Sequence, residues 1–312
     1  MAFQHYLPAT FLACFSTDTT PERRQRMLTV GDTTEGRVFT ASASNVCGVN
    51  NLYTLTEETY NQNLVDNTWT FYEKGLAPAL EQLINQTLTC QIWANTLVPF
   101  VTGLLIRGPD FNERFDERLA NLGIAKISSS DNTNMARLFE YQRLLASVLG
   151  SKWIILRARG NESLITNDLG YAPFANAMTQ DFGIAIPISL QHILIIAPKL
   201  KRRIAIGIGG TWWPIIEYLD LPENEHIGLN QTIAKFSRRF IFGPDNDVIA
   251  RYLFPQKTAP RTPEPVDFGF MSNDLAMIHE HTWFRLLSAI SNPPAHDGDF
   301  IFVDYDKNAK ST

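Results

Sequence analysis

Alternating apolar and polar positions near the N-terminus predict a β-hairpin. Two short β-prone runs, MLTV and RVFTAS, flank the segment GDTTEG, where Gly31, Asp32 and Gly36 suit a hairpin loop. The opening segment MAFQHYLPATFLACF is apolar but has neither the basic start nor the small-residue cleavage site of a signal peptide. We therefore expect it to be kept as part of the folded structure.

Apolar residues recur at helical spacing between residues 64 and 150. The first helix is predicted from Leu64 to about Leu88. The run TCQIWANTLVPFVTGLLIR is apolar nearly all round, so we expect a core helix that Pro99 kinks and that ends near Arg107. The segments FNERFDERLANLG and NMARLFEYQRLLASVLG predict two amphipathic helices. These four helices form a predicted helical block.

After Gly150 the pattern changes to short β-branched runs separated by Gly, Asn or Pro. KWIILRA, ESLIT, GIAIPI, HILIIAP and RIAIGIG predict a mainly antiparallel sheet between residues 150 and 210. The segment NEHIGLNQTIAKFSRRFIFG returns to helical spacing and predicts a helix with Ile233 and Phe240 on one face. Four prolines at 253–267 predict a linker, followed by a helix around LAMIHEHTWFRLLSAI and a strand at DFIFVDY.

These elements predict an α+β fold. We expect the N-terminal hairpin to join the antiparallel sheet of 150–210, and the helices of 64–150 to pack against one face of it, because an exposed apolar sheet face needs cover. Residues 1–250 are predicted to form one domain. Residues 251–312 are predicted to add a Pro-rich linker and a C-terminal extension packed on the same domain.

Composition narrows the class of protein. The chain has 312 residues, 45% hydrophobic and 19% charged, with a net charge of −5, which is typical of a soluble globular protein and argues against a surface that grips nucleic acid throughout. No apolar run is long and unbroken enough for a membrane span. Cys14, Cys47 and Cys90 lack metal or redox spacing, so we expect reduced thiols in a cytoplasmic protein.

Local basic clusters are the exception to the acidic balance. They are KLKRR at 199–203 and the pair Arg238 and Arg239. One interpretation is a nucleic-acid or nucleotide contact, and the favoured one is a solvated rim. Gly207, Gly209 and Gly210 fit a plain turn better than a phosphate loop, and the HEHTW segment lacks the HExxH spacing of a zinc site.

A few polar residues outside these clusters are candidates for a site. They are His5, Tyr6, Arg107, Asn167 and Asp168. Each has an ordinary structural explanation: a histidine can bond a core carbonyl, an arginine can complement a helix end, and Asn-Asp can form an Asx turn. The order in which these residues occur along the chain gives them joint weight.

In that order the segments resemble the DUF4238 family, a domain of unknown function. The matching segments are HYLPATFLACF, MLTVGDTTEGRVF, NNLYTL, RGP, KWIILRARGNESLITND, IAIPISLQHILIIAP and LNQTIAKFSRRFIF, which span about residues 3 to 245. The last is similar to the family's asparagine-bearing helix and contributes Asn230. Two positions depart from the family pattern: a proline follows Asp168 only at Pro173, and Leu190 stands where the family has proline.

Two function classes follow as hypotheses. The first is a hydrolase, such as a nuclease-like toxin or defence effector, with His5 as base or metal ligand, Asp168 as metal ligand or acid, and Arg107 as anion clamp. Tyr6, Asn167 and Asn230 would then bind substrate. The sequence leaves the cofactor open, with a divalent metal as one candidate. The second is a non-catalytic binding or regulatory module whose polar motifs fix the fold.

The hypothesis of a shared site makes a geometric prediction. We expect the N-terminal segment to pack by the loop at 163–174. We further expect His5 to lie within about 8 Å of Asp168, close enough for a carboxylate to orient an imidazole directly or through a water or metal.

Overall fold

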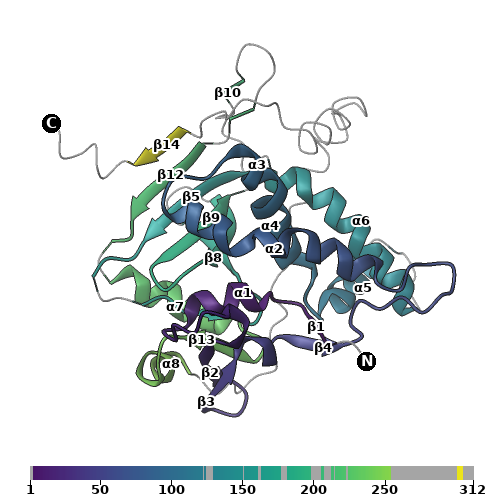
Figure 1. Cartoon of the computed structure of the whole chain (residues 1–312), viewed down its shortest axis with the longest axis horizontal. Helices are drawn as coiled ribbons and strands as arrows, with labels where there is room; N and C mark the ends of the chain where they lie inside the picture. Colours follow the sequence, from purple (N-terminus) through teal and green to yellow (C-terminus); the bar gives the residue numbers. More distant parts are fainter. Residues whose placement is uncertain are drawn as a thin grey trace.

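A computed structural model describes most of the chain up to residue 253. The described residues are 3–121, 123, 129–149, 151–160, 163–176, 181–197, 205–206, 212–213, 215–222, 224–253 and 301–304. The predicted α+β class is confirmed: a large sheet is covered by a group of helices, and a smaller sheet lies below it in Figure 1.

The larger sheet has six strands in the order β14-β12-β5-β9-β8-β7. Their bounds are β14 Ile301–Asp304, β12 Ile215–Asp220, β5 Lys152–Arg157, β9 His192–Ala197, β8 Asp181–Pro187 and β7 Ala172–Asn176. Strands β5, β9 and β8 are antiparallel neighbours, as predicted. Strand β7, which pairs antiparallel with β8, was not predicted from the sequence. The pairs β12–β5 and β12–β14 are parallel, and β12 was not predicted from the sequence.

Successive residues of the central strands enter two different hydrophobic clusters. In β8, Ile184 and Ile186 belong to one cluster and Ala185 to the other. In β9, Ile196 belongs to the first cluster and Ile195 to the second. Because side chains alternate between the faces of a strand, both faces of this sheet are buried. This explains why these strands read as continuous apolar runs.

The smaller sheet has four antiparallel strands in the order β3-β2-β13-β6. Their bounds are β3 Arg37–Ser42, β2 Met27–Asp32, β13 Phe240–Gly243 and β6 Thr166–Asn167. The predicted hairpin is β2–β3. It shares a sheet with β6, the end of the ESLIT segment, through β13. The other predicted strands of 150–210 lie in the six-stranded sheet or pair as β10 with β11, so the hairpin does not join them as predicted.

The prediction that Phe240 lies on a helix is wrong. Helix α7 runs from Glu225 to Lys235, and the Ser237 hydroxyl donates to the carbonyl of Ala234 at its end. The next backbone N–H groups point to the Asp168 carboxylate instead of a helical carbonyl. The chain is therefore extended at Phe240, and a tertiary contact overrides the helical spacing.

The helical block is confirmed. Its elements are α2 Leu64–Ile84, α3 Cys90–Ile92, a π-helical turn at Trp93–Leu97, α4 Val98–Ile106, α5 Phe111–Asn121 and α6 Ser130–Leu149. Every residue of α4 is buried, as its all-round apolar pattern predicts. Pro99 directly follows the π turn and Val98 in a continuous helical run, so the regular hydrogen-bond ladder is interrupted where proline lacks its N–H.

Short elements complete the described fold. They are β1 Phe3–His5, α1 Ala9–Leu12, β4 Gly48–Asn50, β10 Ala205–Ile206, β11 Trp212–Trp213 and α8 Asn246–Tyr252, with 3₁₀ turns at Ala13–Phe15, Arg23–Gln25 and Ala43–Asn45. Strand β1 pairs antiparallel with β4. Among the described residues, no helix combines the length and the apolar character needed to cross a bilayer.

Several predictions fall on residues outside the described part of the chain. They concern the basic segment at 199–203, the glycines at 207–210, the linker from 254 on, and the helix containing HEHTW. The strand predicted at DFIFVDY is confirmed as β14, which pairs with β12.

Candidate functional site

The imidazole of His5 is half-buried at the end of β1. Its Nε2 lies 3.0 Å from the carbonyl oxygen of Ser44. Because a carbonyl can only accept, Nε2 carries the hydrogen and Nδ1 is left as the acceptor. Burial lowers the pKa of His5, against the opposing effect of the bond to Ser44. His5 is therefore a neutral imidazole at neutral pH.

Arg107 follows the last residue of α4 and is 2% exposed. Its Nη2 donates to the carbonyl of His5, and its Nη1 donates to the Tyr72 hydroxyl at 3.0 Å and pairs with Glu73 at 2.5 Å. Burial alone would lower the pKa of Arg107, but the Tyr72 and Glu73 oxygens outweigh it and raise that pKa. The guanidinium thus ties the N-terminal segment to α2, and most of its donors are used internally.

Asp168 directly follows β6 and is 3% exposed. Its Oδ1 accepts the backbone N–H of Arg238 at 2.8 Å, and its Oδ2 accepts those of Arg239 and Phe240 at 2.9 and 3.1 Å. Burial raises the pKa of Asp168 to about 6, although the three N–H bonds work in the opposite direction. Both carboxylate oxygens are therefore occupied by the backbone that leads into β13.

The side-chain amides of Asn167 and Asn230 are fully buried and bonded to backbone. Asn167 Nδ2 donates to the carbonyls of Tyr171 and Ile233, and its Oδ1 accepts the N–H of Leu169. Asn230, on α7, accepts the N–H of Ile165 and donates to Ser163. Both amides fasten the chain around β6 to α7.

The N-terminal segment packs against the loop that follows Asp168, as predicted. Gly170 has φ of +77°, and a Cβ placed on it would lie 2.7 Å from Cδ1 of Leu7. The Tyr6 hydroxyl bonds the Cys47 thiol and is influenced by the Asp168 charge; burial is the main cause that raises the pKa of Tyr6. Tyr6 is thus the candidate that links the N-terminal segment electrostatically to Asp168.

His5 and Asp168 are not bonded to each other. The imidazole faces Ser44, whereas the carboxylate faces the backbone at 238–240. Arg107 is linked to His5 through the backbone carbonyl and not through the imidazole. The expected separation of about 8 Å between His5 and Asp168 stays a prediction.

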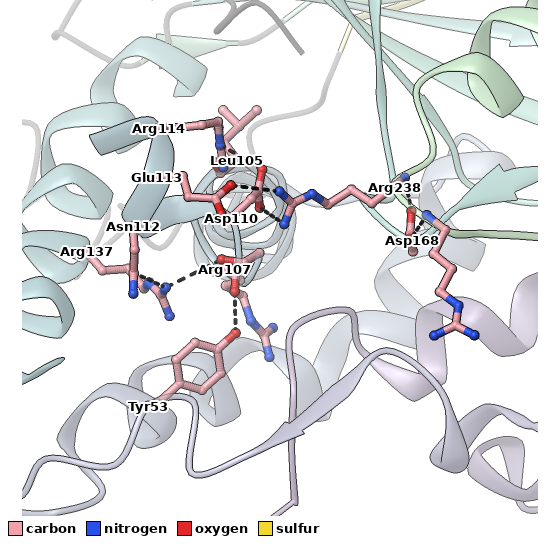
Figure 2. A network of polar contacts seen from close by, with 12 residues as sticks. Tyr53, Leu105, Arg107, Asp110, Asn112, Glu113, Arg114, Arg137, Asp168 and Arg238 are labelled. Carbon is pink, nitrogen blue, oxygen red and sulfur yellow. Dashed lines mark hydrogen bonds and ion pairs between the residues drawn. The ribbon is translucent and has the colours of Figure 1, made fainter. Parts of the chain in front are cut away.

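Four arginines form a polar network between the helical block and the smaller sheet, and Figure 2 shows them as sticks. We call Arg107, Arg114, Arg137 and Arg238 the arginine network. Arg114 Nε lies 2.9 Å from Asp110 Oδ2. Arg238 reaches across with Nη2 at 3.2 Å from Glu113 and Nη1 at 4.0 Å from Asp110, while its backbone N–H bonds Asp168.

The basic pair Arg238 and Arg239 is therefore matched by carboxylates. Arg239 bonds Asp32 and Glu35, each at 2.9 Å, and Arg238 pairs with Glu113 at 3.2 Å. Because the two guanidiniums already have anionic partners, the pair gives no support to a nucleic-acid surface at this place.

The sequence analysis did not single out Arg137, although its position among buried apolar residues at helical spacing could have indicated a buried charge. Arg137 lies on the same stripe of α6 as Tyr141, Leu144 and Val148, which are spaced four, three and four residues apart and are buried. A charged residue on an apolar stripe is rare without a partner. The guanidinium lies 5.1 Å from the ring centre of Tyr53 and 4.9 Å from that of Phe111.

The described residues contain neither a cluster of metal ligands nor an activated thiol. In that part of the chain, no three His, Cys, Asp or Glu side chains gather closely enough to hold a metal ion. Cys14, Cys47 and Cys90 form no disulfide with one another. Burial raises the pKa of each thiol, so none of the three is an activated nucleophile.

The protein has an α+β fold in which the polar candidates Asn167, Asn230 and Asp168 bond backbone groups. The chain belongs to the family described as a protein of unknown function, DUF4238, whose model matches residues 4–247. The resemblance on which the site candidates depend is thereby confirmed. No curated protein and no solved structure matches the chain.

Proposed function

We propose that the protein is a non-catalytic binding or regulatory module whose family motifs hold the fold. The observation that carries this proposal is the position of Asp168, whose two oxygens accept three backbone N–H bonds from residues 238–240. Because three of the acceptor positions of this carboxylate are taken by backbone N–H groups, a metal ion or a substrate proton would have to compete with these bonds.

The other candidates support the same function. Arg107 is buried against Glu73 and Tyr72, which leaves it poorly placed to clamp an external anion. Asn167 and Asn230 use their amides on backbone groups of the loop and of α7. Buried polar groups of this kind are usually retained for specificity of the fold, because leaving one unpaired costs about 1–3 kcal/mol.

One observation favours the hydrolase hypothesis as a second candidate. The pKa of Asp168 is raised to about 6, and His5 is a neutral imidazole with a lowered pKa; perturbed groups of this kind cluster at catalytic sites. Structural networks perturb pKa values as well, and in Asp168 the cause is burial among backbone donors. We therefore rank this candidate second.

The location and partners follow as parts of the proposal. Three free cysteines support a reducing compartment and hence the cytoplasm. The carboxylate partners of Arg238 and Arg239 favour a ligand other than nucleic acid at that pair.

The test is an assay of the purified wild type beside Asp168→Asn and His5→Gln. Each protein is incubated with RNA, DNA and nucleoside triphosphates, with and without Mg²⁺ or Mn²⁺. We expect no turnover above the buffer control in any of the three. Turnover by the wild type that both variants lose while keeping the wild-type circular dichroism spectrum would overturn the proposal in favour of the hydrolase.

Expression in cells gives a second readout. The wild type and Asp168→Ala are induced to equal levels, and growth and nucleic-acid integrity are scored. A binding module leaves both unchanged. Growth arrest with degraded nucleic acid in the wild type alone would support a nuclease-like effector.

A further inference from the structure

Arg137 is the one member of the arginine network that forms no ion pair with a described carboxylate. Its side chain is 1% exposed. Its Nη2 makes two long bonds, 3.5 Å to the carbonyl of Gly108 and 3.4 Å to Oδ1 of Asn112. Within the part of the chain that the structure describes, its Nε and Nη1 have no hydrogen-bond partner. Three of its five N–H donors are therefore unused in a site that excludes water.

The neighbouring arginines differ from Arg137 in this respect. Arg107 pairs with Glu73, Arg114 with Asp110, and Arg238 with Glu113. Burial is the main cause that lowers the pKa of Arg137 to about 10; Tyr53 and the nearby Asp110 carboxylate raise it, and the charges of Arg114 and Arg107 lower it. Arg137 therefore keeps its positive charge at neutral pH.

The aromatic rings compensate only part of this cost. The contacts with Tyr53 and Phe111 are cation–π interactions. They are weaker than the penalty for taking an unpaired ion out of water. The rings also hold the guanidinium in place, so that an arriving ligand meets a preorganised donor group.

We propose that Arg137 is the anchor of an oxyanion-binding site, which takes a phosphate or carboxylate group of a small molecule or of another chain. This inference rests on the binding role proposed above and names its ligand chemistry. An oxyanion supplies the acceptors that Nε and Nη1 lack, and an oxyanion is the group for which the guanidinium fork is best suited.

Asn112 marks the outer side of the site. Its residue is exposed, and its Oδ1 accepts a long bond from Arg137. In Figure 2, Asn112 lies beside the Arg137 guanidinium, and the Tyr53 hydroxyl points toward Arg107. The long bond from Arg137 to Asn112 is the contact that an incoming oxyanion would replace.

The first arm of the test measures anion-dependent stability of the full chain. The melting temperature is followed in inorganic phosphate, acetate and chloride at equal ionic strength. We expect phosphate or acetate to raise it by about 2–4 °C above chloride when the anion is roughly tenfold above its dissociation constant. A larger response to phosphate assigns a phosphoryl ligand, and a larger response to acetate assigns a carboxylate ligand.

Variants decide whether this response belongs to Arg137. Arg137→Gln should lose it, whereas Arg143→Gln should keep it, because Arg143 lies on the same helix but already pairs with Glu140 at 2.8 Å. Arg137→Lys keeps a charge but not the fork, so it should respond weakly. Equal responses of the wild type to all three salts, or a full response in Arg137→Gln, would overturn the proposal.

Asn112→Asp keeps the test decisive if Arg137→Gln fails to fold. This substitution places a carboxylate beside Arg137 at an exposed position. We expect a higher melting temperature in chloride and a lost response to phosphate and acetate. An unchanged response would overturn the proposal. Failure here leaves the turnover assay untouched, so the oxyanion site and the non-catalytic role are tested separately.

Discussion

Two buried charged side chains in this protein, Asp168 and Arg137, differ in the hydrogen-bond partners that the fold gives them. Asp168 lies after β6 and receives three backbone N–H bonds from the segment that leads into β13. Arg137 lies on α6 against two aromatic rings, and none of the described carboxylates forms an ion pair with it. Both side chains are less than 5% exposed. The anion is satisfied within the chain, and the cation is not.

This difference separates a residue that builds the fold from one that is suited to a ligand. Removing a carboxylate that accepts several buried N–H bonds leaves those N–H groups without an acceptor. A substitution of Asp168 should therefore lower the stability of the fold strongly. Removing a charge that has no partner relieves a desolvation penalty, so Arg137 should be cheap to change. Stability measurements on the two residues therefore test the comparison directly.

The largest effect is expected for Asp168→Ala. The substitution leaves three buried N–H groups without acceptors and opens a small cavity, so we expect a loss of about 3–5 kcal/mol in the free energy of unfolding. Urea denaturation measures it. Asp168→Asn keeps one acceptor and should lose less. A loss below about 1 kcal/mol for the alanine variant would mean that the carboxylate does not hold β13.

The pH dependence of Asp168 comes next. Its pKa in the folded state is raised to about 6, above the usual value near 4 of an unfolded chain. The folded state therefore binds the proton more tightly, and the resulting stability is fully present below about pH 4 and is lost as the pH rises through about 6. The size of this change is about 3 kcal/mol.

The control for this prediction is Asp168→Asn, which cannot titrate. The free energy of unfolding is measured from pH 4 to 7 for both proteins, and the difference between them isolates Asp168. A difference that grows in favour of the wild type as the pH rises would show that the N–H bonds dominate over burial.

A smaller loss is expected for Gly170→Ala. An alanine at φ of +77° is strained, and its Cβ would meet Leu7 at 2.7 Å and Leu104 at 3.0 Å. We expect a cost of about 2 kcal/mol, measured by thermal unfolding. Gly160→Ala is the matched control, because Gly160 has φ of +66° but no atoms within 4 Å. Equal losses in the two variants would assign the cost to the backbone alone.

The smallest effect is expected for Arg137→Met. Methionine fills a similar volume between Tyr53 and Phe111 and carries no charge, so we expect a change within about 1 kcal/mol of the wild type, in either direction. Chemical denaturation in chloride checks this. A loss above about 3 kcal/mol would mean that the guanidinium has a strong partner within the chain, and the contrast with Asp168 would disappear.

The sequence by itself determined the elements whose signal is local. The helices of the block, the hairpin β2–β3 and the central strands β8 and β9 follow from periodicity and turn residues, because each spacing is set by the geometry of one element. The order of short motifs was enough to indicate the family, whose model covers residues 4–247. It also placed Asp168 at a strand end.

The tertiary structure decided what these residues bind. The N–H groups of residues 238–240 bond the Asp168 carboxylate instead of helical carbonyls, so the chain is extended there and β13 can pair with the hairpin. A local sequence pattern cannot indicate an acceptor that lies 70 residues away in the chain. In the same way, the sequence places Arg137 on the buried face of α6 but cannot say whether a carboxylate will meet it there. Burial makes an ionised group depend on whatever partner the fold brings to it, and the fold brings three donors to Asp168 and two aromatic rings to Arg137.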